Sequence, residues 1–465
     1  MKKLLLLFSA LAICIMTFAQ DKVVKKIIEI GTTDNQVMNH LDVLSNRIGG
    51  RFIGSDALTN AEEWAIASFK KWGMKVIVED VGALNVGFNR GPWFGRMLSD
   101  DGMILHFATP TFTAGTKGVQ RGEVVIAPRD TQQFNRMKGT FKNAWVLISG
   151  MNAGWPCDTT FMRKEMVEAG AIGFIQASEV PIRALYDRKH CEQYTFDSLP
   201  DVPEIKLDEA QYRIIEKKVR QRQYFQLEFD IRNHYKMGPA KYRNIIGVLE
   251  GSEFPDEYVI VSGHLDAYDV ATGGVDCGSG SSVTMEAARL IMAAGGRPKR
   301  TILFCLWTGE EAGLLGSKYW VEHHPQDMSK ISNMINRDGG PTVCTGITVS
   351  PAMYKDFVSI CKGIDEINPD FPFTVRKREK PRKKPEHAGG SDYAYFAMAG
   401  VPTISPDLSD PKGYNFSYGE IWHTERDLYN KSIPEYQEHS AIVTAIISYG
   451  IANLNHLLSR EGLFE

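Results

Sequence analysis

The sequence predicts an α/β fold: a mainly parallel central sheet flanked by helices, interrupted by an inserted α/β domain. After residue 243, apolar runs of strand length alternate with helical patterns, which is typical of parallel sheets covered on both faces. Over residues 116–235 the pattern changes to short β-branched runs separated by turns. The length of 465 residues, at roughly 150 residues per domain, also predicts two or three domains.

Composition and charge exclude several classes of protein. Hydrophobic residues make up 43% and charged residues 23% of the chain, which are globular values and exclude a disordered or collagen-like chain. The 53 Lys and Arg residues nearly balance the 56 Asp and Glu residues, for a formal net charge of -3. Charge therefore gives no basis for nucleic acid or an anionic membrane as the partner.

Residues 1–19 have the features of a secretory signal peptide. Two lysines precede an apolar run, and Thr17-Phe18-Ala19 is a small-x-small cleavage site. We expect cleavage after Ala19 and a secreted or periplasmic protein. We expect no stable membrane insertion, because no later segment approaches the ~20 apolar residues of a membrane helix.

Six cysteines follow the predicted signal peptide. Their even number in an exported chain permits disulfides, although scattered cysteines in a large domain are more often buried packing residues. Cys157 and Cys191 lie in one segment and are the pair we expect, if any pair forms.

The first part of the mature chain comprises residues 20–115. Helical patterns extend from its start to about residue 81, and a glycine-rich turn at 48–55 separates them. The segment 116–235 contains apolar runs at 122–127, 143–148 and 170–175, which predict strands, and a helical pattern at 161–169.

The last part, residues 236–465, contains the longest apolar strands. Strands are predicted at 244–249, 258–263 and 301–307, with a helix at 282–294 between them. Ligands of parallel sheets bind beyond the carboxyl ends of the strands. The residues that directly follow these strands are therefore the candidates for a functional site.

Polar residues follow the predicted strands that end near 262 and 307, and also a third predicted strand at 331–335. Imidazole and carboxylate groups are zinc ligands, and a catalytic site keeps an open position for water. Two zinc ions that share one carboxylate require at least five converging ligands. The chain supplies this number with His264, Asp276, Glu311, Asp338 and His423.

The order of these motifs resembles the M28 family of zinc exopeptidases, and most closely its carboxypeptidase Q-like members. The matching motifs are H-L-D at 264–266, D-V-x-x-G-x-x-D-x-G-x-G at 269–280, E-E-x-G-L-x-G-S at 310–317, the turn at Asp338 and H-T-x-x-D at 423–427. The resemblance extends over essentially the whole mature chain. Within it, residues 116–235 are similar to the protease-associated domain inserted in several exopeptidases.

The resemblance implies a cofactor of two Zn2+ ions and a role for each ligand. Asp276 would bridge both ions, His264 and Asp338 would hold one ion, and Glu311 and His423 would hold the other. The ligands would belong to a catalytic domain that is built from residues 20–115 and 236–465.

Two further carboxylates take their roles from the same motifs. Glu310 matches the general base of the family, which takes a proton from water and returns it to the leaving amine. Asp266 matches the carboxylate that accepts the second imidazole N–H of the histidine ligand and so selects its tautomer.

Three positions depart from the family pattern. Cys277 follows the bridging Asp276, and we expect a packing residue or a hydrogen-bonding neighbour of the ligands, with a thiolate ligand as the alternative. Arg337 precedes Asp338, and we expect its guanidinium to reach solvent or a carboxylate. Tyr393 stands after Ser391-Asp392, where His is commoner. A tyrosine donor for the oxyanion is also expected, with Tyr414 and Tyr418 as candidates.

The segment 376–385 is strongly basic. Such runs are usually solvated loops. The alternative is that this loop borders the active-site cleft and attracts a carboxylate of the substrate.

The predicted function is hydrolysis of terminal peptide bonds of short peptides, by aminopeptidase or by dipeptidase and carboxypeptidase activity. One alternative is a glutaminyl-peptide cyclotransferase on the same fold with one zinc ion. Another is a non-catalytic peptide-binding relative. A homodimer is compatible with the sequence, which does not determine the oligomeric state.

Overall fold

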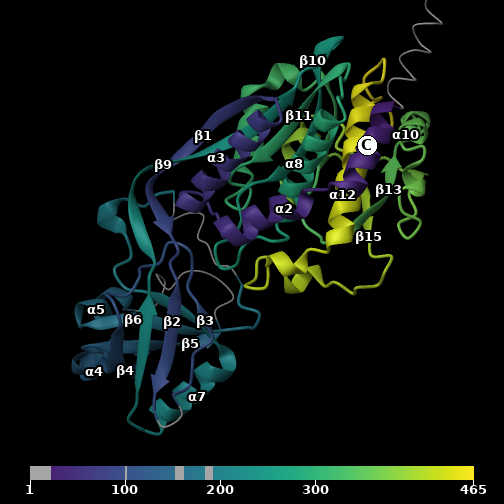
Figure 1. Cartoon of the computed structure of the whole chain (residues 1–465). Helices are drawn as coiled ribbons and strands as arrows, with labels where there is room; N and C mark the ends of the chain where they lie inside the picture. The colour runs from purple at the N-terminus through teal and green to yellow at the C-terminus, as the bar shows by residue number, and fades with distance from the viewer. Residues whose placement is uncertain (1–21, 100–101, 152–161, 184–191) are drawn as a thin grey trace, which may run out of the picture.

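The computed structural model describes residues 22–99, 102–151, 162–183 and 192–465. Two large sheets, each with its own helices, form the two ends of the molecule (Figure 1). Among the described residues, no helix is both long and apolar enough to cross a membrane. The predicted signal peptide and the expected Cys157–Cys191 pair lie outside the described residues.

The central sheet has five strands in the order β1-β9-β11-β10-β12. Strand β10 pairs in parallel with β11 and β12, whereas β9 pairs antiparallel with both β1 and β11. The sheet is therefore mixed and not mainly parallel as the sequence predicted. The strands are β1 (Lys75–Asn89), β9 (His234–Leu249), β10 (Phe254–His264), β11 (Arg300–Trp307) and β12 (Ile331–Asn336).

The long pair of β1 and β9 is the reason for this difference. β1 leads out of the central sheet toward the second sheet, and β9 returns beside it in antiparallel register from Lys75↔Val248 to Asn89↔His234. Residues 75–81, which we expected to be helical, form the start of β1. The earlier helical prediction is confirmed by a helix over residues 22–33, α2 (Val37–Asp42), a π-helical turn (Val43–Ile48) and α3 (Asp56–Lys71).

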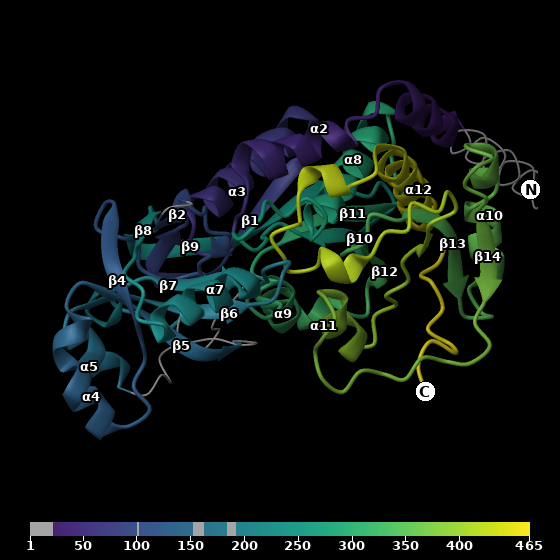
Figure 2. The ribbon, with the colours of Figure 1, turned by 90° about the horizontal axis from the view of Figure 1, so that it is seen from below.

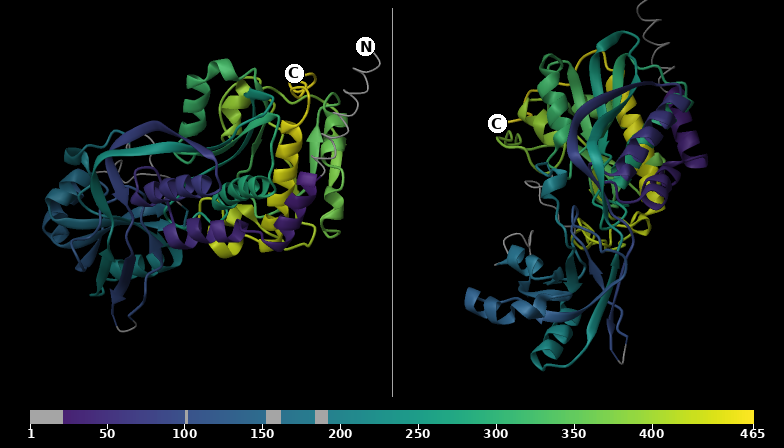
Figure 3. Two further views of the ribbon diagram at one scale, coloured as in Figure 1. Left: turned by 45° about the horizontal axis from the view of Figure 1, so that its top comes forward. Right: turned by 90° about the vertical axis from the view of Figure 1, so that its left-hand side faces the viewer.

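Helices cover both faces of the central sheet (Figure 3, right). Side chains alternate between the faces along each strand: in β11, Ile302, Phe304 and Leu306 face one core, and Leu303 and Cys305 face the other. The first core is covered by α3, α8 (Gly278–Ala293) and α12 (Pro434–Ala452), and the second by α9 (Leu315–His323) and α11 (Tyr393–Met398).

The second sheet has seven strands in the order β2-β8-β4-β5-β6-β7-β3. Helix α7 (Glu209–Arg220) packs on one face, and α4 (Thr131–Met137) and α5 (Arg163–Glu168) pack on the other, each against a separate core. The strands are β2 (Trp93–Leu98), β3 (Phe107–Ala108), β4 (Gln120–Ile126), β5 (Ala144–Met151), β6 (Ala171–Ser178), β7 (Glu204–Asp208) and β8 (Gln226–Ile231).

Two of these strands precede the insert that the sequence predicted at residues 116–235. β2 pairs antiparallel with β8, and β3 pairs antiparallel with β7. The second sheet therefore begins at Trp93, because its edges are completed by strands from the preceding segment.

A small sheet of β14 (Thr374–Lys377), β13 (Val343–Val349) and β15 (Asp407–Ser409) lies beside the central sheet, next to α10 (Tyr354–Ile360) (Figure 2). Strand β14 contains the start of the basic segment 376–385.

Candidate metal centre

The ends of three adjacent parallel strands bring the predicted ligands to one edge of the central sheet. β10 ends at His264, β11 is followed by Glu310 and Glu311, and β12 is followed by Asp338. Asp276 lies at the end of the loop after β10, just before α8. His423 comes from a loop far along the chain, where it adopts a positive φ of 57°.

The carboxylate of Asp276 lies between two histidines. Its Oδ1 is 3.2 Å from Nε2 of His264, and that nitrogen is 3.3 Å from Oδ1 of Asp338. Its Oδ2 is 3.4 Å from Nε2 of His423, which is 3.0 Å from Oε2 of Glu311. The five predicted ligands thus form two histidine–carboxylate pairs that share one carboxylate.

Burial and like charge make this group of carboxyls unfavourable without a cation. Burial raises the pKa of Asp276 to about 6, and burial together with Asp276 raises the pKa of Glu311 well above its usual value. Oδ2 of Asp276 is buried and accepts no hydrogen bond from the described residues. The ligand atoms of His264, Asp276 and Glu311 lie within 4.8 Å of one another. An imidazole nitrogen with carboxylate oxygens is the donor set that zinc prefers, so these residues fit zinc.

Asp266 positions the turn that carries Glu310 and Glu311. Its Oδ1 and Oδ2 accept hydrogen bonds from the backbone N–H groups of these two residues, both at 3.1 Å. Nδ1 of His264 lies 3.0 Å from the backbone carbonyl oxygen of Asp266 and 3.6 Å from its carboxylate. The main-chain oxygen is thus nearer to the imidazole than the carboxylate that the family resemblance implied.

Glu310 lies in a cavity of about 340 Å³ beside these residues. Burial raises its pKa to about 9, although the neighbouring His264 opposes this shift. The cavity is lined by Asp276, Glu310, Glu311, Gly313, Leu314, Asp338, Ala388, Gly389, Gly390, Tyr395, Trp422 and His423. No residue of the basic segment 376–385 is among them, so this lining does not support the expectation that the segment borders the cleft.

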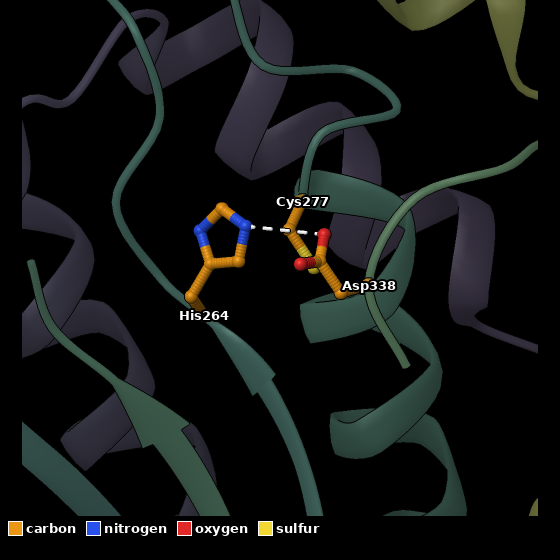
Figure 4. A group of neighbouring side chains, drawn as sticks. All are labelled: His264, Cys277 and Asp338. Carbon is orange, nitrogen blue, oxygen red and sulfur yellow. Dashed lines mark ion pairs between the residues drawn. The ribbon is translucent and has the colours of Figure 1, made fainter. Parts of the chain in front are cut away.

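Cys277 lies next to His264 and Asp338 (Figure 4). The ligand atoms of these three residues are within 4.8 Å of one another. The Cys277 thiol donates a hydrogen bond to the carbonyl oxygen of Arg337 at 3.2 Å, and burial raises its pKa. A protonated thiol bound to a carbonyl is consistent with the predicted packing role.

Contrary to expectation, Arg337 is buried and forms no ion pair with a carboxylate of the described residues. Its side chain is buried and contacts Sγ of Cys344, the carbonyl oxygen of Thr342 and Oε1 of Gln437. The guanidinium therefore connects the turn before Asp338 to β13 and α12.

Neither candidate tyrosine is among the residues that line the metal cavity, but Tyr418 is half-buried and lies near Asp276 and Asp338. Burial and the nearby Asp276 and Asp338 raise the pKa of Tyr418, whose hydroxyl also lies close to Gly339. Tyr414 is exposed and donates a hydrogen bond to Oε1 of Glu435, outside the lining of the metal cavity.

Two supporting residues were not predicted from the sequence. Oδ1 of Asp427 accepts a 2.6 Å hydrogen bond from the backbone N–H of Val275, and both its oxygens lie near the N–H of Asp276. The fully buried guanidinium of Arg51 donates to the carbonyl oxygens of Leu265, Thr272 and Gly273. Asp427 was visible in the H-T-x-x-D motif, and Arg51 in the glycine-rich turn, but neither pattern specifies these distant partners.

The comparisons with known proteins agree with this geometry. Residues 244–447 match the model of peptidase family M28. The chain is 31% identical to rat carboxypeptidase Q over 238 residues, 49% of this chain and 46% of the rat protein. It is 25% identical to carboxypeptidase Q of Xenopus laevis over 453 residues, 94% of this chain and 91% of the frog protein.

Two solved structures share the fold. A peptidase M28 precursor from Shewanella amazonensis aligns over 95% of this chain and 98% of its own, with a TM-score of 0.61 and 20% identity. BSAP, a zinc aminopeptidase from Bacillus subtilis, aligns over 92% and 97%, with a TM-score of 0.55 and 17% identity. Residues 244–447 thus match a peptidase family M28 domain, and the likeness to these solved structures shows that the chain shares their fold.

Proposed function

We propose that this protein is a zinc-dependent exopeptidase that hydrolyses terminal peptide bonds of short peptides with two Zn2+ ions. The observation that carries the proposal is the Asp276 carboxylate, whose two oxygens face separate histidine–carboxylate pairs in one cavity. Carboxypeptidase Q and a zinc aminopeptidase among the related proteins support the same reaction class.

The five ligands divide into two groups around Asp276. His264 and Asp338 would hold one ion, and Glu311 and His423 the other, with Asp276 shared. Zinc in such a site supplies Lewis-acid activation of water and of the scissile carbonyl. A single-ion cyclotransferase would leave one histidine–carboxylate pair without a function, so the complete set favours two ions.

Glu310 would move the proton in the reaction. Its carboxylate lies in the cavity beside the ligands, where it can accept a proton from the attacking water and donate it to the leaving amine. The Tyr418 hydroxyl would donate a hydrogen bond to the developing oxyanion. Asp266 would keep Glu310 in place through the backbone of the turn.

The remaining parts of the proposal concern organisation. Residues 93–231 would form the insert that resembles a protease-associated domain, between two parts of the catalytic domain. Residues 1–19 would be removed during export to the periplasm or the exterior. The proposed substrates are short peptides.

The decisive experiment is cleavage of a peptide library by the zinc-loaded protein. Zinc-loaded protein is incubated with peptides blocked at the amino end, at the carboxyl end or at neither, and the products are identified by mass. We expect cleavage only next to one free terminus, which distinguishes aminopeptidase from carboxypeptidase or dipeptidase activity.

A variant tests the assignment of the base. Glu310→Gln should lower kcat by about 10²- to 10⁴-fold while the zinc content stays unchanged. Full activity in this variant would overturn the assignment of Glu310. Cleavage in the middle of doubly blocked peptides would overturn the exopeptidase proposal.

A further inference from the structure

A second cavity, of about 280 Å³, lies next to the metal centre but does not share its lining. It is formed where the end of β12, the small sheet and the basic segment meet. Its lining residues are Asn336, Thr348, Arg378, Arg382, Tyr393, Thr403, Ile404, Ser405 and Asp407. Of the basic segment 376–385, only Arg378 and Arg382 line this cavity.

Neither arginine forms an ion pair with a carboxylate of the described residues. Arg378 donates one long hydrogen bond of 3.4 Å, from Nη2 to the carbonyl oxygen of Thr348. Arg382 donates to the carbonyl oxygen and Oγ1 of Thr403 at 3.2 and 3.4 Å, and its Nε is buried without a hydrogen-bond partner. The planar guanidinium group presents five N–H donors that suit planar and tetrahedral oxyanions. Most of these donors in Arg378 and Arg382 form no hydrogen bond with the described residues.

The two positive charges destabilise each other in this cavity. Burial lowers the pKa of Arg382, and Arg378 lowers it further. Such a pair is stabilised by an anion between or beside the guanidinium groups. The carboxylate of Asp407 does not fill this role, because its Oδ2 lies 3.2 Å from Nη1 of Arg376 and accepts a hydrogen bond from Thr348.

The contacts of the C-terminal segment fix the position of Arg382. Its backbone N–H donates to Leu463, its carbonyl accepts from Glu465, and its guanidinium lies over the ring of Phe464 at 5.4 Å. Tyr393 and Ser405 also line the cavity. These contacts hold Arg382 in place, which differs from a solvated basic loop.

We propose that Arg378 and Arg382 form a binding site for a small oxyanion, either a free tetrahedral anion or the carboxylate of a small organic acid. The cavity volume is sufficient for a small anion. The site is separate from the peptidase reaction and does not depend on the proposed function.

The site is connected to the metal centre through one short path. Asn336 lines the oxyanion cavity, and its Nδ2 donates to Oγ of Ser391 at 2.8 Å. Ser391 in turn contacts Asp338 through a side-chain hydrogen bond. Gly389 and Gly390 line the metal cavity, whereas Tyr393 of the same segment lines the oxyanion cavity.

The test is calorimetric titration of the zinc-loaded full-length protein with sulfate and, separately, with glutarate, at constant ionic strength in chloride. We expect saturable binding of at least one anion at one site per chain. Arg378→Gln should raise its Kd about tenfold or more, as loss of a charge-assisted hydrogen bond implies. Arg378→Lys, which keeps the charge but loses the fork, should have an intermediate effect.

Lys380→Gln is the matched control, because it removes one charge from the same basic segment outside the cavity lining. It should leave the Kd unchanged. Arg378 makes only one long hydrogen bond and its charge is repelled by Arg382, so Arg378→Gln should not lower the melting temperature in chloride. Tighter binding of sulfate would identify a free tetrahedral anion, and tighter binding of glutarate a carboxylate.

Two results would overturn the proposal. The first is the absence of saturable binding for both anions. The second is an equal loss of affinity in Lys380→Gln and Arg378→Gln, which would show diffuse charge attraction in place of a site.

Discussion

Asp427 illustrates how single residues outside the ligand set act on the metal centre. Its carboxylate accepts hydrogen bonds from the backbone before and at Asp276, the ligand that both histidines face. Groups that orient metal ligands contribute about 10- to 100-fold to metal affinity. Asp427 is therefore expected to influence zinc binding without supplying a ligand atom.

The variant Asp427→Ala tests this influence. We predict a zinc Kd that is about 10- to 100-fold higher, measured by competition with a chelator. Asp410→Ala is the control, because the Asp410 carboxylate also accepts backbone N–H bonds, from Tyr414 and Asn415, in a loop away from the centre. Equal zinc affinity in both variants would contradict the role of Asp427.

His439 makes the stability of the folded chain depend on pH. It is buried in α12 against the ring of Phe371, both ring nitrogens have no hydrogen-bond partner among the described residues, and burial lowers its pKa to about 4. The unfolded chain binds a proton near pH 6.5 and the folded chain only near pH 4. The neutral ring thus favours the folded state above pH 6.5, and this contribution is lost as the pH falls toward 4.

We predict that His439→Leu reduces the loss of stability on acidification, by up to about 3 kcal/mol between pH 6.5 and 4. The measurement is urea unfolding at pH 7.5, 5.5 and 4 for wild type and variant, with about 1.4 kcal/mol of the effect expected by pH 5.5. The exposed His323 provides the control variant His323→Leu. An identical pH dependence in wild type and His439→Leu would contradict this account.

The sequence predicted that the five candidate ligands lie close together, but not which residues support them. His264, Glu311 and Asp338 follow apolar strands, so their convergence follows from the parallel register of β10, β11 and β12. The contacts of Arg51 and Arg337 depend on backbone carbonyls far away in the chain. Such contacts leave no periodic signal in the sequence.

At the scale of elements, the second sheet contacts the loop that carries His423. Ile182 exchanges two 2.9 Å hydrogen bonds with Glu425, and Nε2 of His106 lies 2.8 Å from Oε2 of Glu425. Arg183 donates to the carbonyl oxygens of Trp422 and Gly419 and lies over the ring of Trp422. Segments next to β3 and β6 of the second sheet therefore contact the loop around His423.

We predict that Arg183→Ala lowers zinc affinity and kcat/KM by about 3- to 10-fold, since each lost hydrogen bond is worth about 1 kcal/mol. Arg213→Ala is the matched control, because Arg213 is an exposed arginine of the same unit that pairs with Glu209 in its own helix. The readouts are zinc competition and steady-state kinetics. A loss of the same size in Arg213→Ala would indicate a general effect on the insert.

The predicted strands were confirmed, but their partners were not all predicted. The apolar runs at 244–249 and 301–307 lie within β9 and β11, as expected. Their antiparallel pairing depends on the path of β1 and β9 to and from the second sheet. Hydrophobic periodicity indicates which residues are buried, and it does not determine the direction of neighbouring strands.

At the scale of the whole molecule, the two sheets have separate hydrophobic cores. The cores of the seven-stranded sheet are formed by residues such as Trp145, Phe174 and Phe229, whereas all five predicted ligands belong to the other sheet and its loops. A ligand that binds only the folded state stabilises the unit that contains its site. Metal removal should therefore affect the two units differently.

We predict that chelation of zinc destabilises the central sheet and leaves the second sheet largely unchanged. At a zinc concentration 1,000 times the Kd, bound zinc contributes about 4 kcal/mol, and its removal leaves buried carboxyls close together without a cation. In hydrogen–deuterium exchange with mass spectrometry, peptides from α8 and residues 264–276 should lose protection after chelation, and peptides from β5 and β6 should not. Restored protection on return of zinc is the control, and equal loss in both units would show that they unfold as one.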